Sequence, residues 1–376
     1  MTKAAELAKM GEVLTNSQIG GRRNLIINGA MQVAQRGTSS AIGGGQAYHS
    51  VDRFIAQAFG ADNFSGTLEQ STTVPSGQGF SNSLKYNIAT AESAIDANEL
   101  FDIRYKIEAQ DLQQLANGTS SAKKITLSFW VRSHVTGTYS ISINKLTNTT
   151  RLYPVLYTIT SADTWEKKEI VIPGDTSGGG IDNSNEAGFQ IVWGLSVSST
   201  FNDGTGTNNQ WQDYSNGAAF KGHTANAVGT QGAFYITGLQ MEVGSQATPF
   251  EHRSFGEELL LCQRYLQRFE GVEGQGSNTD GTRFISANWD RTSHFVGHIF
   301  SPEMRSAPTI GFSSADDFYV YAAGSANIVS GVTLTGSGRT GAEFVFTTSA
   351  TGTVGDAGFV RIFDHTNGFI EFRAEL

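Results

Sequence analysis

The sequence has little of several residue types, and each shortage excludes a class of protein. Only one of its 376 residues is a cysteine, Cys262, which excludes an intramolecular disulfide and any multi-cysteine metal site. Charged residues make up 16%, below the roughly one quarter that is usual in soluble domains. The 26 basic and 35 acidic residues give a net charge of −9, and no basic run is present. We therefore expect no nucleic-acid partner.

Long apolar runs and recognisable catalytic motifs are also missing. No window approaches the roughly 18 apolar residues of a membrane-spanning helix, and the first residues lack the pattern of a secretory signal. We expect synthesis in a cytoplasm without classical export, and no membrane insertion. GxSxG, HExxH and P-loop motifs are absent, so the sequence predicts no enzyme of those classes and no cofactor.

What the chain does have favours strands and tight turns. It contains 44 Gly, 24 Phe, 11 Tyr and 5 Trp, with only 6 Pro. Short alternating apolar and polar runs recur between residues 64 and 250, separated by Gly, Asn, Asp and Ser. They predict strands at 84–89, 101–109, 124–132, 138–145, 152–159, 165–172, 188–197 and 233–243. This spacing is typical of a jelly-roll β-sandwich, so the predicted class is all-β.

A helix is predicted near the N-terminus, in residues 3–14. Leu7, Met10 and Leu14 are spaced three and four apart, which gives one apolar seam. Twelve residues are too few for a helix that is stable alone in water. We expect the seam to dock on sister chains or on a larger assembly; a frayed terminus is the alternative.

A second helix is predicted in residues 254–269. Ser254 and Glu257 have the spacing of a capping box. Cys262, Tyr265 and Phe269 then recur at helical spacing and form an apolar stripe, which we expect to take part in oligomerisation or anchoring.

The chain divides into four predicted parts. Residues 1–45 form the N-terminal helix and an anchoring arm that includes an apolar run at 24–29. Residues 46–252 form the jelly-roll domain, and 253–282 form the connecting helix with a Gly-rich linker. Residues 283–376 form a small C-terminal β-sandwich. Its predicted strands are 283–288, 294–300, 307–312, 317–322, 342–347, 358–363 and 368–374.

Several stretches, taken in order, resemble a known family. They are RNLIINGAMQVAQRG at 23–37 with 52–54, FYITGLQMEVG at 234–244 with 247–251, the segment 258–265, PEMRSAPT at 302–309 and the final AEL. Together these resemble tail-fibre-type proteins of tailed phages, many of them marine. The resemblance implies a jelly roll similar to carbohydrate-binding modules, homotrimeric assembly and a place on the virion, on either the tail or the capsid.

A long polar segment at 201–223 is the predicted glycan-binding region. Sugar recognition needs aromatic faces for C–H surfaces and amides or carboxylates for hydroxyls, often on a long loop. Trp211 and Tyr214 are the first choices for glycan contact, followed by Phe201, Asp213 and Asn209. Packing of these aromatic side chains against the sandwich is the favoured alternative, because exposed aromatics are the exception.

Two segments carry potential metal ligands, and neither is predicted to bind a metal. Residues 182–186 crowd oxygen ligands into one turn, but they lack the spacing of a calcium loop, so a hydrated turn is favoured. His294 and His298 share a face of a predicted strand without a third ligand nearby, which favours two sheet-surface histidines.

The predicted function is that of a non-enzymatic virion component. We expect a short homotrimeric tail fibre that attaches to other virion proteins through its N-terminus and recognises host-surface polysaccharide. One alternative is a capsid-decorating or head-fibre protein that stabilises the shell. A second alternative is a glycan-cleaving enzyme, which would need two carboxylates across a groove, and the sequence does not pair them.

Overall fold

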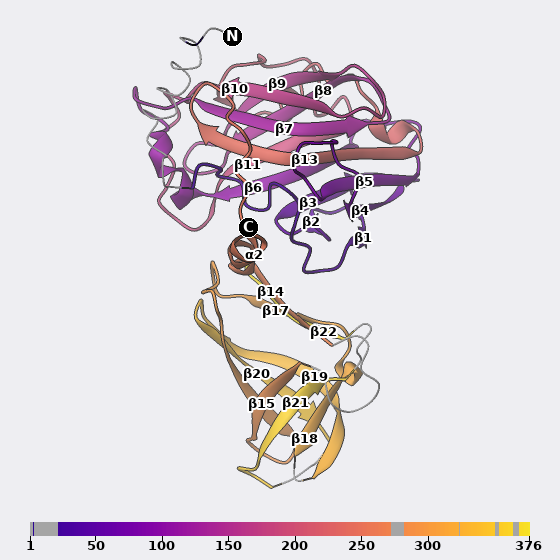
Figure 1. Ribbon diagram of the computed structural model, residues 1–376, viewed down its shortest axis with the longest axis vertical. Coiled ribbons are helices and arrows are strands. Elements are labelled where there is room, and N and C mark those ends of the chain that lie inside the picture. The colour runs from indigo at the N-terminus through magenta and orange to yellow at the C-terminus, as the bar shows by residue number, and fades with distance from the viewer. Residues whose placement is uncertain (1–2, 4–21, 272–281, 323, 350–352, 364–367) are drawn as a thin grey trace. The chain divides into compact units, whose positions relative to one another are not determined.

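A computed structural model describes residues 3, 22–271, 282–322, 324–349, 353–363 and 368–376 (Figure 1). The chain forms two compact units, Met1–Glu258 with Leu376, and Leu259–Glu375, called here the N-terminal and C-terminal units. Among the described residues, no helix has the length and apolarity needed to cross a membrane. The predicted helix at 3–14, with Leu7, Met10 and Leu14, lies outside the described residues except for Lys3.

The N-terminal unit is built from two antiparallel sheets. The six-stranded sheet has the order β1 (Ser39–Ala41), β4 (Ser65–Ser71), β5 (Ser83–Thr90), β13 (Gly232–Val243), β7 (Ile125–Ser133) and β10 (Glu166–Ile172). The seven-stranded sheet has the order β12 (Gln212–Asp213), β9 (Arg151–Ile159), β8 (Gly137–Lys145), β11 (Ala187–Val197), β6 (Leu100–Glu108), β3 (Phe54–Phe59) and β2 (Ala47–Tyr48). Short 3-10 helices lie at η1 (Ala109–Leu115), η2 (Asn216–Ala218) and η3 (Ala227–Gly229).

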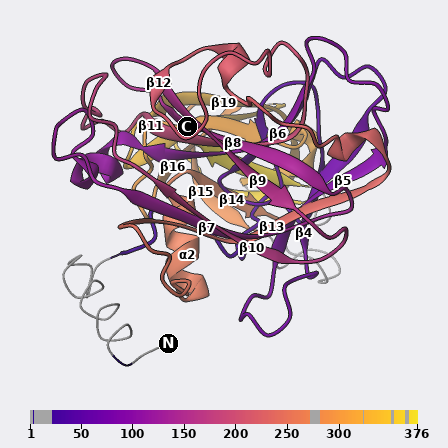
Figure 2. The same ribbon diagram turned by 90° about the horizontal axis from the view of Figure 1, so that it is seen from above.

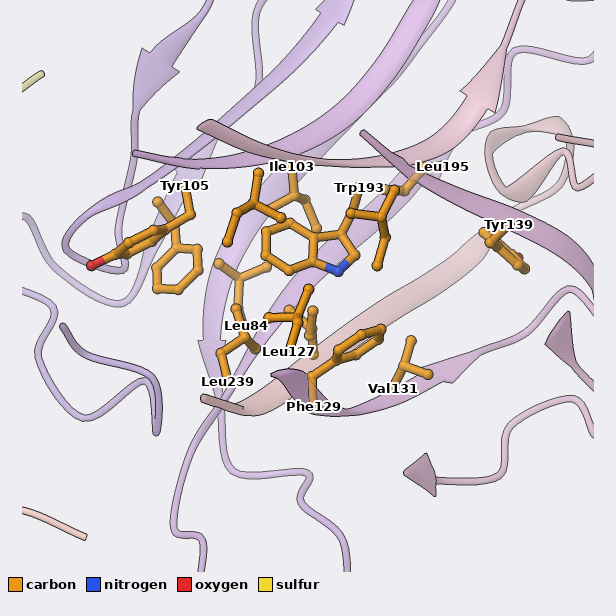
Figure 3. Close-up of a cluster of buried hydrophobic side chains, with 14 of the residues drawn as sticks. Leu84, Ile103, Tyr105, Leu127, Phe129, Val131, Tyr139, Trp193, Leu195 and Leu239 are labelled. Atoms are coloured by element: carbon orange, nitrogen blue, oxygen red, sulfur yellow. The ribbon is translucent and has the colours of Figure 1, made fainter. Parts of the chain in front are cut away.

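Alternation along the strands places one aromatic-rich core between these two sheets. Trp193 of β11 is fully buried, and Figure 3 shows its indole between Ile103 of the same sheet and Leu127 and Phe129 of the other. The Trp193 and Phe129 rings meet edge to face, with centroids 6.1 Å apart. Chain positions two apart lie on one face of a strand, so the core residues and the outward-facing residues alternate.

The C-terminal unit contains a three-stranded sheet and a closed barrel. The helix α2 (Phe255–Gln263) precedes the sheet β14 (Leu266–Glu270), β22 (Phe369–Arg373) and β17 (Thr309–Phe312). The barrel has the order β15 (Arg283–Asn288), β16 (Ser293–Ile299), β20 (Gly341–Thr348), β19 (Ser325–Ser337), β18 (Phe318–Ala322) and β21 (Ala357–Ile362), with η4 (Ala315–Asp317) before β18. Figure 2 views the same strands from above.

The all-β class is confirmed, and all eight strands predicted between 84 and 243 are present as β5–β11 and β13. The C-terminal strands close into a barrel where a small sandwich was expected. Closure follows from pairing of β15 with both β16 and β21, the former at Ala287 and Asn288. The apolar run 24–29 is an extended segment ending in a turn and is not a strand; Met31 N–H donates to the Asn28 carbonyl at 2.9 Å.

The predicted helix at 254–269 is wrong in its second half. The helix ends at Gln263, and Tyr265 N–H donates to the Cys262 carbonyl at 2.9 Å. Residues from Leu266 onward then pair with β22, so that Leu266 lies opposite Arg373 and Phe269 opposite Ile370. Pairing with a distant strand satisfies the backbone here, and it overrides the local helical spacing.

Candidate functional site

The outer face of the seven-stranded sheet carries a row of polar side chains. On β6, Phe101, Ile103 and Tyr105 point into the core, so Asp102 and Arg104 lie on the opposite face. The register places Gln57 of β3 opposite Asp102, and Val192 of β11 opposite Arg104. This face is called here the polar face.

Asp102 is the most buried charge of the polar face. Arg104 holds it with two hydrogen bonds, Nε to Oδ1 at 2.7 Å and Nη2 to Oδ2 at 2.8 Å, and Gln57 Nε2 donates to Oδ2 at 2.8 Å. Burial raises the pKa of Asp102, while the Arg104 guanidinium and Gln57 oppose that rise. The paired carboxylate therefore fixes the guanidinium of Arg104 in one orientation on the face.

The segment 198–226, called here the covering loop, lies over the same face. Its residues Ala218, Ala219 and Phe220 pack with Leu100, Leu152 and Val192 of the sheet in a small apolar cluster. Gly194 of β11 leaves the room for this contact, because a Cβ there would lie 3.1 Å from Cδ1 of Phe220. His223 fastens the far end of the loop: its Nδ1 accepts from the Ser140 N–H at 3.2 Å, and its Nε2 lies 2.8 Å from the Ala225 carbonyl oxygen.

Tyr214 is the exposed aromatic of the covering loop near the polar face. Its side chain is 45% exposed, and its hydroxyl donates to Asn216 Oδ1 at 3.0 Å. Partial burial raises the pKa of the Tyr214 hydroxyl; the charge of Arg104 lowers it and that of Asp102 raises it. The charges of Arg104 and Asp102 thus act on the Tyr214 hydroxyl, and glycan contact by Tyr214 stays a prediction.

Asp213, the residue before Tyr214, carries an exposed carboxylate. Its side chain is 82% exposed and accepts from Nη1 of Arg151 at 2.7 Å, while Nε of Arg151 donates to the buried Asp175 at 2.7 Å. Asn209 is also exposed and has a left-handed backbone with φ of 62°. Thus Tyr214, Asp213 and Asn209 all present polar groups at the surface of the covering loop.

Trp211 belongs to the core and not to the surface. It is 9% exposed, and its indole stacks on Phe189 at a centroid distance of 6.0 Å and lies 5.5 Å from the ring of Tyr153. Its Nε1 donates to the Pro173 carbonyl at 2.7 Å. Both features remove Trp211 from the glycan-contacting set, because a ring packed between neighbours offers no face to a sugar. Packing, the favoured alternative for this residue, is what the structure shows.

Phe201 is half-buried in the apolar cluster under the covering loop. Its ring meets that of Phe59 edge to face at 6.5 Å, and Phe59 is 46% exposed. The loop therefore joins Phe201 to an exposed aromatic of β3, Phe59, which no sequence pattern singles out. Asp102, Arg104 and Gln57 were missed as well. The sequence does contain a signal for Asp102 and Arg104, because polar residues two positions apart on a strand lie on the same face.

The predicted oligomerisation stripe of the second helix does not form. Cys262 is 0% and Tyr265 1% exposed, and Phe269 on β14 packs against the core of the C-terminal unit. Cys262 and Tyr265 are thus enclosed by their own chain, while Phe269 is only partly buried, and a subunit contact at these residues stays a prediction.

The histidines on β16 share a face, as expected, but this face points inward. His294 is buried with Nε2 2.9 Å from Thr348 Oγ1, and the His298 ring stacks on Phe372 at 5.5 Å. Desolvation lowers the pKa of both rings. Within the described residues, no three His, Cys, Asp or Glu side chains come together as a metal site, at 182–186 or elsewhere.

Known proteins offer distant likenesses. No family model and no curated protein matches the chain. Similar solved structures include the enzymatically active domain of tailspike protein 4 of bacteriophage CBA120, with TM-score 0.32, 13% identity, and coverage of 59% of this chain and 21% of that one. A carbohydrate-binding module designated CBM4 has TM-score 0.28 and 11% identity, with coverage of 58% and 98%. A family 11 carbohydrate-binding module from Clostridium thermocellum has TM-score 0.26 and 12% identity, with coverage of 56% and 99%. Since the TM-scores are this low, function has to be derived from the residues of the chain itself.

Proposed function

We propose that this chain is a glycan-binding structural component of a phage virion, a short trimeric fibre that attaches by its N-terminus. The observation that carries the glycan part is the half-exposed ring of Tyr214 on the covering loop, whose hydroxyl responds in its pKa to the charges of Arg104 and Asp102. The virion, the trimer and the attachment end are supported by the ordered motifs near both ends of the sequence, which resemble tail-fibre-type proteins.

The chemistry around Tyr214 suits a sugar. An aromatic ring with one open face packs on the C–H surface of a pyranose, and the flanking polar groups set the orientation of its hydroxyls. Asp213 offers a carboxylate held in place by Arg151, and Asn209 offers an exposed amide on the same loop. Fixed groups of this kind lose little side-chain entropy on binding, so even a small contact area gives useful affinity.

We propose binding without catalysis at this site. Glycoside hydrolysis needs one carboxyl group that is protonated and reaches the substrate, and a second carboxylate on the other side of the bond. Asp102 is 0% exposed and bonded to Arg104, and Asp213 is paired with Arg151. Both carboxylates are thus engaged in ion pairs with arginine. We therefore expect that incubation with host polysaccharide releases no reducing ends.

The test is a Tyr214→Ala variant of the full chain, assayed for binding to polysaccharide purified from the host surface. We expect a loss of at least about tenfold in affinity, corresponding to about 1.4 kcal/mol. Tyr214→Phe keeps the ring and should retain most of the binding. Tyr235→Ala is the matched control: it removes a partly exposed tyrosine from the outer face of the other sheet, where Arg132 lies 5.3 Å from the ring centroid.

Two outcomes would count against the proposal. Equal binding by wild type and Tyr214→Ala would remove the covering loop from the site. Loss of binding by Tyr235→Ala alone would indicate that the glycan binds to the six-stranded sheet. Antibody labelling of intact particles tests the virion part, and sedimentation of the full chain tests the trimer.

A further inference from the structure

The most exposed apolar side chains among the described residues lie on one hairpin of the barrel. Eleven large hydrophobic side chains in the described part of the chain are exposed, and seven of them belong to the C-terminal unit, which is less than a third of the chain. The three with the greatest exposure are Ile285 at 85%, Ile299 at 84% and Trp289 at 73%, on β15, on β16 and in the turn between them. Exposed apolar residues that are scattered singly need no explanation, but a cluster of them marks an interaction surface.

These three side chains point away from the barrel core. Phe284 on β15 and Val296 on β16 are core residues, so the positions that alternate with them face outward. Ala287 lies opposite Phe295 across the hairpin, and the rings of Trp289 and Phe295 are in contact, with centroids 5.9 Å apart. The outward side of this hairpin is called here the apolar strip, and its residues are Ile285, Ala287, Trp289, Phe295, Gly297 and Ile299.

A closed turn holds Trp289 in place at one end of the apolar strip. The Trp289 N–H donates to the Ser293 carbonyl at 3.0 Å. Asp290 Oδ1 accepts from the N–H groups of Thr292 and Ser293, both at 2.6 Å, and from the Thr292 hydroxyl at 2.8 Å. The backbone that carries the indole is thus ordered before any partner arrives, so the chain loses little further entropy when the ring is covered.

The residue types of the apolar strip suit a protein surface better than a sugar. A sugar site needs polar side chains beside the aromatic ring to bind hydroxyls, and none of the six residues of the strip has one. The nearby carboxylate of Asp290 is already engaged in the turn. At the centre of protein interfaces aromatic side chains are enriched and charged ones are depleted, lysine among them. The strip carries no charge, and Leu259–Glu375 contains no lysine.

The dimensions of the apolar strip favour further copies of the chain around an axis. Two strands about 4.8 Å apart, with about 3.3 Å per residue, give a surface of roughly 20 Å by 10 Å. A stable interface between two proteins covers about 800 Å² on each of them, far more than this strip. At a rotation axis each copy needs to present only a narrow surface, because that surface meets both neighbours. Val345 of β20 and Phe359 of β21, which lie opposite Phe295 and Ile285, would widen the contact.

The charges at the tip of the hairpin are complementary between copies. Asp290 and Arg291 are adjacent and exposed, and Arg291 has no ion-pair partner among the described residues. In a ring of copies related by rotation, Arg291 of one copy can approach Asp290 of the next, and the same contact repeats around the ring. An acidic and a basic residue side by side therefore allow each copy to attract its neighbour.

We infer that the apolar strip is the surface through which copies of this chain associate, with three strips meeting around one axis. The inference rests on the trimer of the proposed function and names a contact surface for it. Trp289, Ile285 and Ile299 become buried in the assembly, as large anchoring side chains are at the centre of an interface.

The test is sedimentation velocity of the full chain over a range of concentrations. We expect wild type to form a trimer, and Trp289→Asp to raise the concentration of half-dissociation at least about tenfold, because it places a carboxylate inside an apolar contact. Ile285→Asp should act in the same way. Ile328→Asp is the matched control, since Ile328 is 54% exposed on β19, on the opposite side of the barrel from β15. It should associate as wild type does.

Cross-linking between exposed cysteines locates the contact. Ala287→Cys lies in the apolar strip and Ala326→Cys lies on β19 opposite Tyr321, and both positions are exposed. A short bismaleimide should join two chains of Ala287→Cys and no chains of Ala326→Cys. The native Cys262 is buried, so wild type should not react.

The inference is overturned if a trimer persists in both Trp289→Asp and Ile285→Asp, a result that leaves the trimer of the proposed function standing on another surface. It is overturned together with that trimer if wild type sediments as a monomer at every concentration. The glycan part is decided separately by Tyr214→Ala, which should assemble as wild type does. A fluorescence change when host polysaccharide is added to a monomeric chain, absent from Trp289→Asp, would instead identify the strip as a sugar contact.

Discussion

Protonation of His223 should loosen the covering loop and destabilise the N-terminal unit below pH 6.5. His223 is 5% exposed, and burial lowers its pKa from 6.5 to about 4. Its Nδ1 accepts the Ser140 N–H, which assigns the neutral ring with the proton on Nε2, donated to the Ala225 carbonyl. A proton on Nδ1 would face the Ser140 N–H and break that bond, so the charged ring is disfavoured in the folded state.

The size of the effect follows from the two pKa values. The unfolded chain takes up the proton near pH 6.5 and the folded chain only near pH 4. The stabilisation by His223 is therefore complete above pH 6.5 and is lost as the pH falls towards 4. A shift of about 2.5 units, at about 1.4 kcal/mol each, corresponds to roughly 3.5 kcal/mol in the free energy of unfolding.

The assay is chemical denaturation at half-unit steps from pH 7 to pH 4, on wild type and His223→Gln. Glutamine offers an acceptor and a donor but does not titrate. Other buried histidines whose pKa is lowered, His49 among them, contribute equally to both proteins, so the difference between the two curves isolates His223. Parallel curves across this range would refute the assignment of a buried neutral imidazole.

Two further substitutions test packing. Trp211→Ala should lower the free energy of unfolding by about 3–5 kcal/mol, the usual result for a large aromatic side chain in a core. A change below about 1 kcal/mol together with loss of glycan binding would instead identify Trp211 as a ligand contact. Arg253 is 4% exposed and bonds the carbonyls of Asn24 and Ile26 and the carboxylate of Glu258. Arg253→Ala should cost about 3–5 kcal/mol in urea denaturation, because it leaves these acceptors buried and Glu258 uncompensated, and a loss under about 1 kcal/mol would contradict this.

Most of the sandwich could be predicted because its strands alternate locally. In β7, Ile125, Leu127, Phe129 and Val131 all face the core, as their period of two predicts. The strand β19 was missed for an equally local reason. It contains Gly331 and Gly336, and glycine is depleted in strands. In the structure both lie at register shifts, where β19 bulges against β20.

The candidate site was harder to predict, because its geometry depends on segments far apart in the sequence. The sequence placed Trp211 and Tyr214 in one polar segment, but only the fold shows that the first enters the core and the second stays half-exposed. Burial of Trp211 depends on Phe189 and Tyr153, which come from two other strands. Pairing of β14 with β22, about a hundred residues away, likewise overrode the helical spacing of Cys262 and its neighbours.

The closed barrel also determines how neighbours can attach to the C-terminal unit. A strand at the rim of an open sheet displays free N–H and C=O groups and invites another polypeptide to extend the sheet. In the barrel each of the six strands has a partner on both sides over at least part of its length, so fewer of these groups are free than at the rim of an open sheet. Contacts with a neighbour there involve mainly side chains. Substitutions on the outer wall can then change the side chains of the surface without exposing an aggregation-prone edge.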